Sequence, residues 1–113
     1  MYHSNPQSWI AEEASRREFA RLRIDCRARI RIGNRQYAGY LHNISQGGAK
    51  LRTISPIHRV GAVILRLPDL PPLHCDLRWT DSYNAGVMFG TKLSEDALLR
   101  WAETRTAFID PIR

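Results

Sequence analysis

The sequence predicts an all-β fold: a six-stranded antiparallel β-barrel followed by one C-terminal α-helix. Three observations indicate this fold class. Short segments in which apolar and polar residues alternate recur along the 113 residues, and period two is typical of a strand with one face in a core and one in water. Turn signals rich in glycine, proline and asparagine separate these segments. A capped amphipathic segment follows the last of them, and closing the six strands into a barrel removes exposed sheet edges.

The N-terminal part of the chain holds the clearest strand signal. Residues 1–15 are predicted to be a lead-in and residues 16–113 a single domain. Residues 9–19 have the composition of a short helix, with Ser8 as its cap. At 22–32 six apolar residues then alternate strictly with five charged ones, which predicts a long strand. The apolar members are Leu22, Ile24, Cys26, Ala28, Ile30 and Ile32. Gly33-Asn34 indicates the turn that ends this strand.

Five further strands are predicted at 36–42, 49–54, 62–67, 73–80 and 86–91. The proline-rich stretch 68–72 is a loop, because proline cannot donate to a central ladder, and 81–84 is a turn. Ser94 followed by two acids predicts a helix start, since serine caps a helix and acids stabilise its first turn. The inward stripe of this helix is expected to contain Leu98, Trp101, Ala102 and Arg105. The core-facing residues of the fifth strand are expected to be Leu73, Cys75, Leu77 and Trp79.

The composition argues against several classes of function. The longest aliphatic run, at 62–65, has four residues, so we expect no membrane insertion and no signal peptide, and a cytoplasmic location. Cys26 and Cys75 fall on predicted inward faces, and no cysteine or histidine pair has zinc-ligand spacing, so both cysteines are expected in the core and no metal is expected. The sequence has neither clustered acids for metal ions nor a nucleophile elbow, which predicts that the protein is not an enzyme.

The charge is concentrated in one region of the chain. The net charge is +6, and 15 of the 17 basic residues are arginine. Residues 16–35 contain eight arginines and two acids, so this segment accounts for the entire net charge. Such a region favours a negatively charged partner, and the planar arginine fork pairs with guanine edges and phosphates. A merely solvated strand face is the alternative interpretation.

Two motifs stand out from this framework. Arg17 and Arg21 form an RxxxR pair before the first strand, and Asn43, Ser45 and Gly48 form an NxSxxG motif between the second and third strands. The RxxxR spacing also occurs at Arg23/Arg27, Arg27/Arg31 and Arg31/Arg35. Those pairs follow automatically from an alternating strand, whereas Arg17/Arg21 lies outside the alternation. The two motifs, in this order and on matching strands, resemble the PilZ family, whose marks are RxxxR and a later (D/N)xSxxG.

The resemblance extends over roughly residues 16–92, including Ala49-Lys50-Leu51, the strand ending at Trp79 and Gly86-Val87-Met88-Phe89. It implies a single-domain PilZ-type barrel that binds cyclic di-GMP and needs no other cofactor. An arginine fork can meet guanine O6 and N7 or lie flat on the purine. Asparagine and serine offer an acceptor and a donor, and the two glycines permit unusual backbone conformations and close approach of the ligand. The implied ligand residues are Arg16, Arg17, Arg21, Asn43, Ser45, Gly47 and Gly48.

The resemblance also implies a mechanism and leaves alternatives open. Ligand, as one molecule or an intercalated dimer, would order residues 9–21 and change the surface shown to an unidentified protein in motility, biofilm or polysaccharide signalling. One alternative is a PilZ-like interaction module without ligand. A second is a single-stranded nucleic-acid binder, which the strand arginines at 23, 27, 29 and 31 favour. The motif residues themselves also fit a solvated helix end and a side-chain-capped turn.

Overall fold

The computed structural model describes residues 21–105 and 107–110, so the helix predicted at 9–19 lies outside the described residues. The described part contains eight strands and one helix. They are β1 (Arg21–Ile24), β2 (Cys26–Ile32), β3 (Arg35–Ile44), β4 (Gly48–Thr53), β5 (Gly61–Arg66), β6 (Leu73–Asp81), β7 (Asn84–Phe89), α2 (Glu95–Glu103) and β8 (Ala107–Asp110). All strand pairs are antiparallel.

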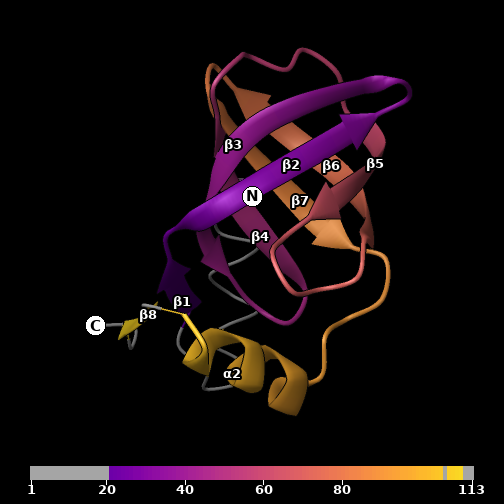
Figure 1. Cartoon of the computed structure of the whole chain (residues 1–113). Coiled ribbons are helices and arrows are strands. Elements are labelled where there is room, and N and C mark those ends of the chain that lie inside the picture. Colours follow the sequence, from indigo (N-terminus) through magenta and orange to yellow (C-terminus); the bar gives the residue numbers. More distant parts are fainter. Residues whose placement is uncertain (1–20, 106, 111–113) are drawn as a thin grey trace, which may run out of the picture.

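Six of these strands close into a barrel in the order β2-β5-β6-β7-β4-β3, with β2 and β3 also paired to each other (Figure 1). The predicted six-stranded barrel with a C-terminal helix is therefore confirmed. In this ring β7 lies across from β2, and β4 lies across from β5. The two remaining strands extend the sheet at one end of the barrel, where β1 pairs with both β3 and β8.

The prediction of alternating burial at 22–32 is confirmed, but the prediction of one continuous strand is wrong, because the segment forms two strands, β1 and β2. Burial alternates along it as expected, but the strand is interrupted at Asp25. Beyond the interruption β2 pairs Cys26 with Leu41, whereas β1 pairs Leu22 with Ile44, so the register on β3 changes between the two. The chain thereby leaves the barrel to pair with β8, a strand that the sequence pattern did not predict. Alternation reports which face is buried and carries no information about the pairing partner.

The core is filled by aliphatic side chains from all six strands of the barrel and from β1. The largest fully buried ones are Ile24, Ile30, Leu41, Ile44, Leu51, Leu65, Leu77 and Val87. Among the residues predicted for the core, Cys75 is buried and Cys26 is half-buried. Both cysteines are free thiols.

The buried thiol leads to a reactivity prediction. Burial raises the pKa of the Cys75 thiol to about 12, and burial also raises the pKa of Cys26. Because the thiolate is the nucleophile, we expect Cys75 to resist iodoacetamide at mildly alkaline pH in the folded protein and to react once the protein is denatured. Mass spectrometry of peptides over a labelling time course measures this directly. Rapid labelling of Cys75 in the native protein would contradict the core assignment.

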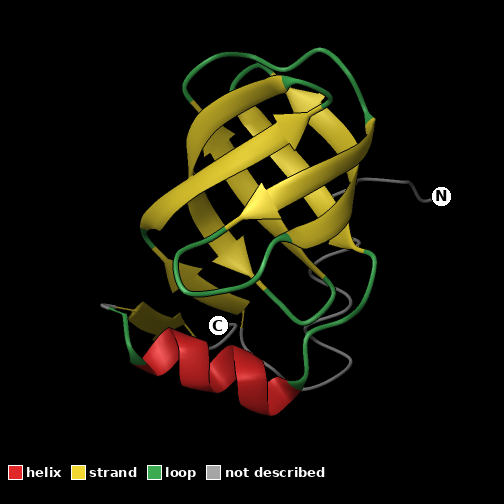
Figure 2. Cartoon of the chain, turned by 45° about the vertical axis from the view of Figure 1, so that its right-hand side comes forward, coloured by secondary structure: helices red, strands yellow, loops and turns green. Residues whose placement is uncertain are grey.

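The helix α2 begins as predicted, with the Ser94 hydroxyl accepting a hydrogen bond from the Ala97 amide at 3.0 Å. Its buried residues are Leu98, Trp101 and Ala102. Figure 2 shows the helix lying across one end of the barrel. The expectation that Arg105 belongs to the helical stripe is corrected, because the helix ends at Glu103.

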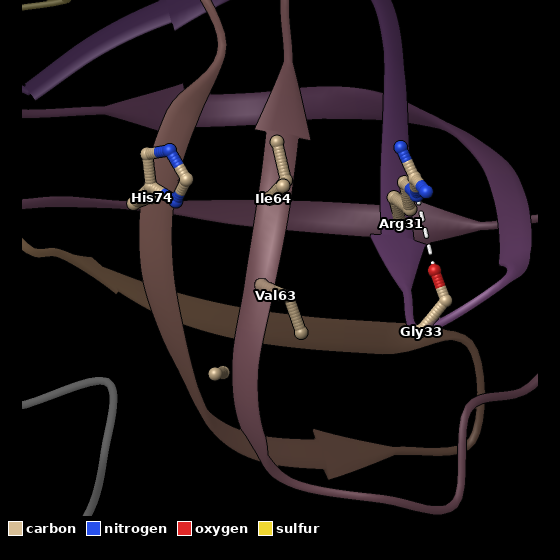
Figure 3. Close-up of a pocket in the computed structure, with 6 residues that line it drawn as sticks. Arg31, Gly33, Val63, Ile64 and His74 are labelled. Carbon is tan, nitrogen blue, oxygen red and sulfur yellow. Dashed lines mark hydrogen bonds between the residues drawn. The ribbon is translucent and has the colours of Figure 1, made fainter.

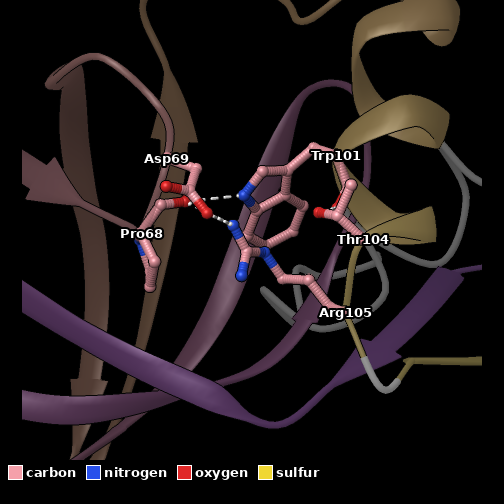
Figure 4. A network of polar contacts seen from close by, with 5 residues as sticks. All are labelled: Pro68, Asp69, Trp101, Thr104 and Arg105. Carbon is pink, nitrogen blue, oxygen red and sulfur yellow. Dashed lines mark hydrogen bonds and ion pairs between the residues drawn. The ribbon is translucent and has the colours of Figure 1, made fainter.

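Arg105 instead holds the helix against the loop between β5 and β6. The Trp101 indole donates to the Pro68 carbonyl at 2.7 Å, and Arg105 donates to the same oxygen at 2.9 Å (Figure 4). The Arg105 guanidinium also pairs with the Asp69 carboxylate at 2.5 Å and lies 4.8 Å from the centre of the Trp101 ring. These contacts fix the C-terminal helix over the barrel end.

Candidate ligand-binding site

The second sequence motif forms a tight turn between β3 and β4. The Ser45 amide donates to the Gly48 carbonyl at 2.8 Å, and its hydroxyl donates to the same oxygen at 3.4 Å. The Gln46 side chain donates to the Leu93 carbonyl, and the Leu93 amide donates back to the Gln46 carbonyl, both at 2.9 Å. These hydrogen bonds connect the turn to the segment that leads into α2. Capping of the turn by Ser45 is confirmed.

The glycines of the motif do not have the conformation expected from the sequence. Positive φ angles among the described glycines occur at Gly33 and Gly61. Gly47 and Gly48 are both buried, and neither adopts a left-handed conformation. Gly48 is the first residue of β4 and pairs with Met88, and the Gly47 carbonyl accepts from the Phe89 amide at 2.9 Å. The two glycines thus serve in the pairing of the turn with β7.

Asn43 lies within a strand rather than in the turn where the sequence placed it. It is the penultimate residue of β3, and the β3–β4 register shifts between Leu41 and Asn43. Leu41 pairs with Leu51 and Ile44 with Ala49, and all four are buried core residues. The shift therefore gives Asn43 the outer face, beside Lys50, with which it pairs.

The side chain of Asn43 is buried even though it lies on the outer face. Asn43 is 6% exposed and Ser45 5% exposed. The Asn43 Oδ1 atom has no hydrogen-bond partner in the part of the chain that the structure describes. A buried acceptor without a donor costs about 1–3 kcal/mol, so the turn-capping alternative for Asn43 finds no support in the described contacts. The oxygen is itself covered from solvent, so a ligand donor reaches it only when the atoms that cover it move aside.

The register of β1 brings the first motif towards the second. Leu22 pairs with Ile44, so the backbone of Arg21 lies opposite Ser45, and Arg23 lies opposite Asn43. Arg23 is exposed and alternates with the buried Leu22, which places its side chain on the outer face. Arg16 and Arg17 lie outside the described residues. Of the predicted site residues, the structure brings together Arg21, Asn43, Ser45, Gly47 and Gly48.

Positive charge surrounds Asn43 on both sides. The half-buried His42 precedes it, and the pKa of His42 is lowered, first by burial and then by Lys50, Arg23 and Arg52, with Asp25 opposing. Burial is the largest cause of the lowered pKa, and the three cations add a net positive field around His42. Lys50 and Arg23 are candidate ligand residues that the motifs missed. Both residues lie beside Asn43 only through strand pairing, so identifying them requires the register of β1 and β4 on β3.

Trp79 is a second residue whose position corrects the sequence prediction. The β6–β7 register shifts between Leu77 and Trp79, so Leu77 pairs with Val87 while Trp79 pairs with Gly86. Since Leu77 and Val87 are buried in the core, Trp79 lies on the outer face. A side chain on Gly86 would collide with the Trp79 indole nitrogen, so the ring lies directly over the glycine.

One row of residues across the sheet therefore connects Trp79 with Asn43. Gly86 pairs with Trp79 on one side and with Lys50 on the other, and Lys50 pairs with Asn43. Neighbouring strands are about 4.8 Å apart, so the row extends roughly 14 Å from the half-buried indole of Trp79 to Asn43, whose Oδ1 atom has no described partner. The row provides an aromatic surface, a cation and an unpaired acceptor along one outer face.

Comparison with protein-family models gives the decisive observation. The model of the PilZ domain matches residues 15–103, which is most of the chain. This chain belongs to the PilZ domain family. PilZ domains form the cyclic di-GMP receptor family and are binding or adaptor modules, generally without enzymatic activity. Comparisons with curated proteins and with solved structures gave no match.

Within residues 21–105 and 107–110, no group of three or more histidine, cysteine or acidic side chains could hold a metal ion. Over the same ranges, no helix has the length and apolar character needed to cross a membrane. The candidate ligand-binding site of this PilZ domain is the outer face around Asn43, because the motif residues and the unpartnered Oδ1 atom lie there.

Proposed function

We propose that this protein is a cytoplasmic bacterial receptor for cyclic di-GMP and binds the ligand on the outer face of β1, β3 and β4. The observation that carries the proposal is the buried Asn43 Oδ1 without a partner among the described residues. Asn43 belongs to the NxSxxG motif that is characteristic of the PilZ family, and the strand register places it opposite Arg23. The ligand residues proposed from the motifs are Arg16, Arg17, Arg21, Asn43, Ser45, Gly47 and Gly48.

The chemistry of the ligand matches this face. A guanine carries an amino group that can donate to Asn43 Oδ1, and its O6 and N7 atoms accept from an arginine fork. Arg23 and Lys50 lie where they attract the two phosphates. Trp79 offers a π-surface on the same row, on which a purine can stack. The proposed site needs no metal and no further cofactor.

The proposed output is a change of surface. Arg16 and Arg17 belong to the segment before β1, so a ligand that engages them also fixes that segment against the barrel. In this proposal residues 1–15 are a lead-in and residues 16–113 are the domain. Ligand binding orders residues 9–21 and thereby changes the protein surface that is available to a partner protein. The proposed partner acts in motility, biofilm or polysaccharide signalling. One ligand molecule and an intercalated dimer are distinguished by the measured stoichiometry.

Calorimetric titration of the purified full chain with cyclic di-GMP tests the proposal. GTP and single-stranded oligothymidylate serve as controls, the first for guanine recognition alone and the second for general attraction to phosphates. Selective micromolar binding of cyclic di-GMP is the expected result. No heat with any of the three, from a protein shown to be folded by circular dichroism, would instead favour the ligand-free interaction module.

The lowered pKa of His42 predicts proton uptake on binding. In the free protein the pKa of His42 lies below its ordinary value of 6.5, so the folded state resists protonation and loses stability as the pH falls below that value. The two phosphates of the ligand offset the positive field and raise the pKa of His42 in the complex. The affinity for cyclic di-GMP should therefore increase as the pH falls into the titration range of His42. Calorimetry in two buffers with different ionisation enthalpies measures the uptake. The His42→Gln variant should abolish the difference between buffers; an unchanged difference would assign the proton elsewhere.

A further inference from the structure

A second basic surface lies on the opposite side of the barrel from β4 and β7. Its cations are Arg27, Arg29 and Arg31 on β2 and Arg66 on β5, and all four are exposed. We call these four residues the β2–β5 arginine face. The site around Asn43 lies at the far end of β3 from the hairpin that begins at Gly33. Arg29 pairs with Ala38, five residues from Asn43 and roughly 16 Å along β3, and Arg31 pairs with Gln36, which is farther still.

The arginines of this face have no acidic partners in the described chain. Arg29 donates to the Gln36 side chain at 3.4 Å, and Arg31 donates to the Gly33 carbonyl at 3.0 Å. The ion pairs of the described residues lie elsewhere, at Arg78–Asp76 and Arg105–Asp69. None of the four arginines therefore forms an ion pair within residues 21–105.

One pair on this face works against stability. Arg29 and Arg66 are directly opposite each other on β2 and β5. Like charges at such cross-strand positions are destabilising. A barrel selected for stability alone would place an acid at one of the two positions, so the pair indicates a surface that meets a negatively charged partner.

An open groove of about 380 Å³ adjoins the arginines. It is lined by Arg31, Gly33, Ala62, Val63, Ile64 and His74. In Figure 3 the Arg31 side chain lies at one side of this groove and His74 at the other, with Ile64 between them. Ile64 pairs with both Arg31 and His74 across the sheet. The groove thus combines an apolar floor with a cationic wall.

We infer that the β2–β5 arginine face docks an acidic segment of a partner protein, with an apolar side chain of that segment seated in the groove. Arginines at alternate positions of β2 are about 6.6 Å apart, which matches acids at alternate positions of an extended peptide. Surfaces for single-stranded nucleic acid stack successive bases on aromatic rings. The described part of this face offers one exposed ring, Tyr40, opposite Arg27. The inference does not depend on cyclic di-GMP binding.

The test uses the full chain and fluorescence anisotropy. The probe is a fluorescein-labelled peptide of repeating Glu-Leu-Glu-Ser, compared with a Lys-Leu-Lys-Ser counterpart and with labelled oligothymidylate. The Arg29→Glu/Arg66→Glu variant should weaken binding of the acidic peptide by about tenfold or more, since like charges across an interface cost several kcal/mol. The matched control is Arg59→Glu/Arg100→Glu, which makes the same charge change at two exposed positions elsewhere.

A single variant separates docking from folding. Arg66→Glu places an acid opposite Arg29, so the melting temperature should rise while peptide binding falls. A loss of binding caused by unfolding would move both quantities downwards.

Three outcomes would overturn the inference. They are the absence of acidic-peptide binding, an equal loss in the Arg59/Arg100 control, and tighter binding of oligothymidylate through the same arginines. The last outcome would identify a nucleic-acid surface instead. Cyclic di-GMP titration of the Arg29→Glu/Arg66→Glu variant should match the wild type, so failure here is distinguishable from failure of the proposed receptor function.

Discussion

Replacing both Arg17 and Arg21 by alanine is expected to weaken cyclic di-GMP binding by roughly 30- to 10⁴-fold. Each bidentate arginine–guanine contact is worth about 1–3 kcal/mol, and the loss of two contacts converts to that range of affinity. The register of β1 supports the choice of Arg21, whose backbone lies opposite Ser45 of the second motif. Calorimetric titration of the double variant, with its fold checked by circular dichroism, gives the affinity.

The chain supplies an unusually close control for this experiment. Arg31 and Arg35 have the same RxxxR spacing, and replacing both removes the same charge at the hairpin end of β3, seven or more residues along that strand from Asn43. The Arg31→Ala/Arg35→Ala variant should keep its affinity within about threefold of the wild type, because exposed charges at this distance are screened by salt. Equal losses in the two double variants would mean general electrostatic attraction. Unchanged affinity in the Arg17/Arg21 variant would remove the proposed receptor function.

The parts of the fold that depend on local pattern were predictable from the sequence. The alternation from Leu22 to Ile32 predicted which side chains enter the core, and the structure buries Leu22, Ile24, Ala28 and Ile30. Ser94 and the acids after it predicted the start of α2. These features follow from the period of one segment or the chemistry of one cap, and neither depends on the rest of the chain.

The features that depend on pairing between distant segments were not predictable in this way. Trp79 was expected inside the barrel because it continues the alternation of Leu73, Cys75 and Leu77. A register shift after Leu77 reverses its face, and one-residue shifts of this kind leave no mark on hydrophobicity. The sequence pattern likewise did not predict β8, because this strand is defined by its pairing with the distant β1.

For the candidate site, the sequence identified the residues but not what surrounds them. The motif named Asn43 from its spacing alone, but placed it in a turn. The shift after Leu41 puts it on the outer face of β3, beside Lys50 and opposite Arg23. A motif records which residues are present, whereas the surrounding cations depend on three strands that meet only in the fold. The burial of Asn43 Oδ1 without a described partner could be found only from the structure.

Asn43→Leu is expected to change stability and ligand binding in opposite directions. Leucine has a similar size and removes an acceptor that is buried without a partner among the described residues, so the free energy of unfolding of the ligand-free protein should rise by about 1 kcal/mol. A guanine donor that loses this acceptor is left unpaired, at a cost of about 1–3 kcal/mol. Cyclic di-GMP affinity should then fall by roughly 5- to 150-fold. Urea denaturation and calorimetric titration measure the two effects separately.

Asn43→Asp is the matched control, because it keeps an acceptor oxygen at the same position. Lys50 and Arg23 lie on either side of it and compensate the added charge, so this variant should bind more tightly than Asn43→Leu. If Asn43→Leu instead destabilises the free protein, its amide is already satisfied and Asn43 is a structural residue. If Asn43→Leu is more stable and still binds with wild-type affinity, the amide is a strained acceptor that the ligand never reaches. Only a gain in stability together with a loss of affinity fits an acceptor kept unpaired for the ligand, since selection for stability alone would have removed it.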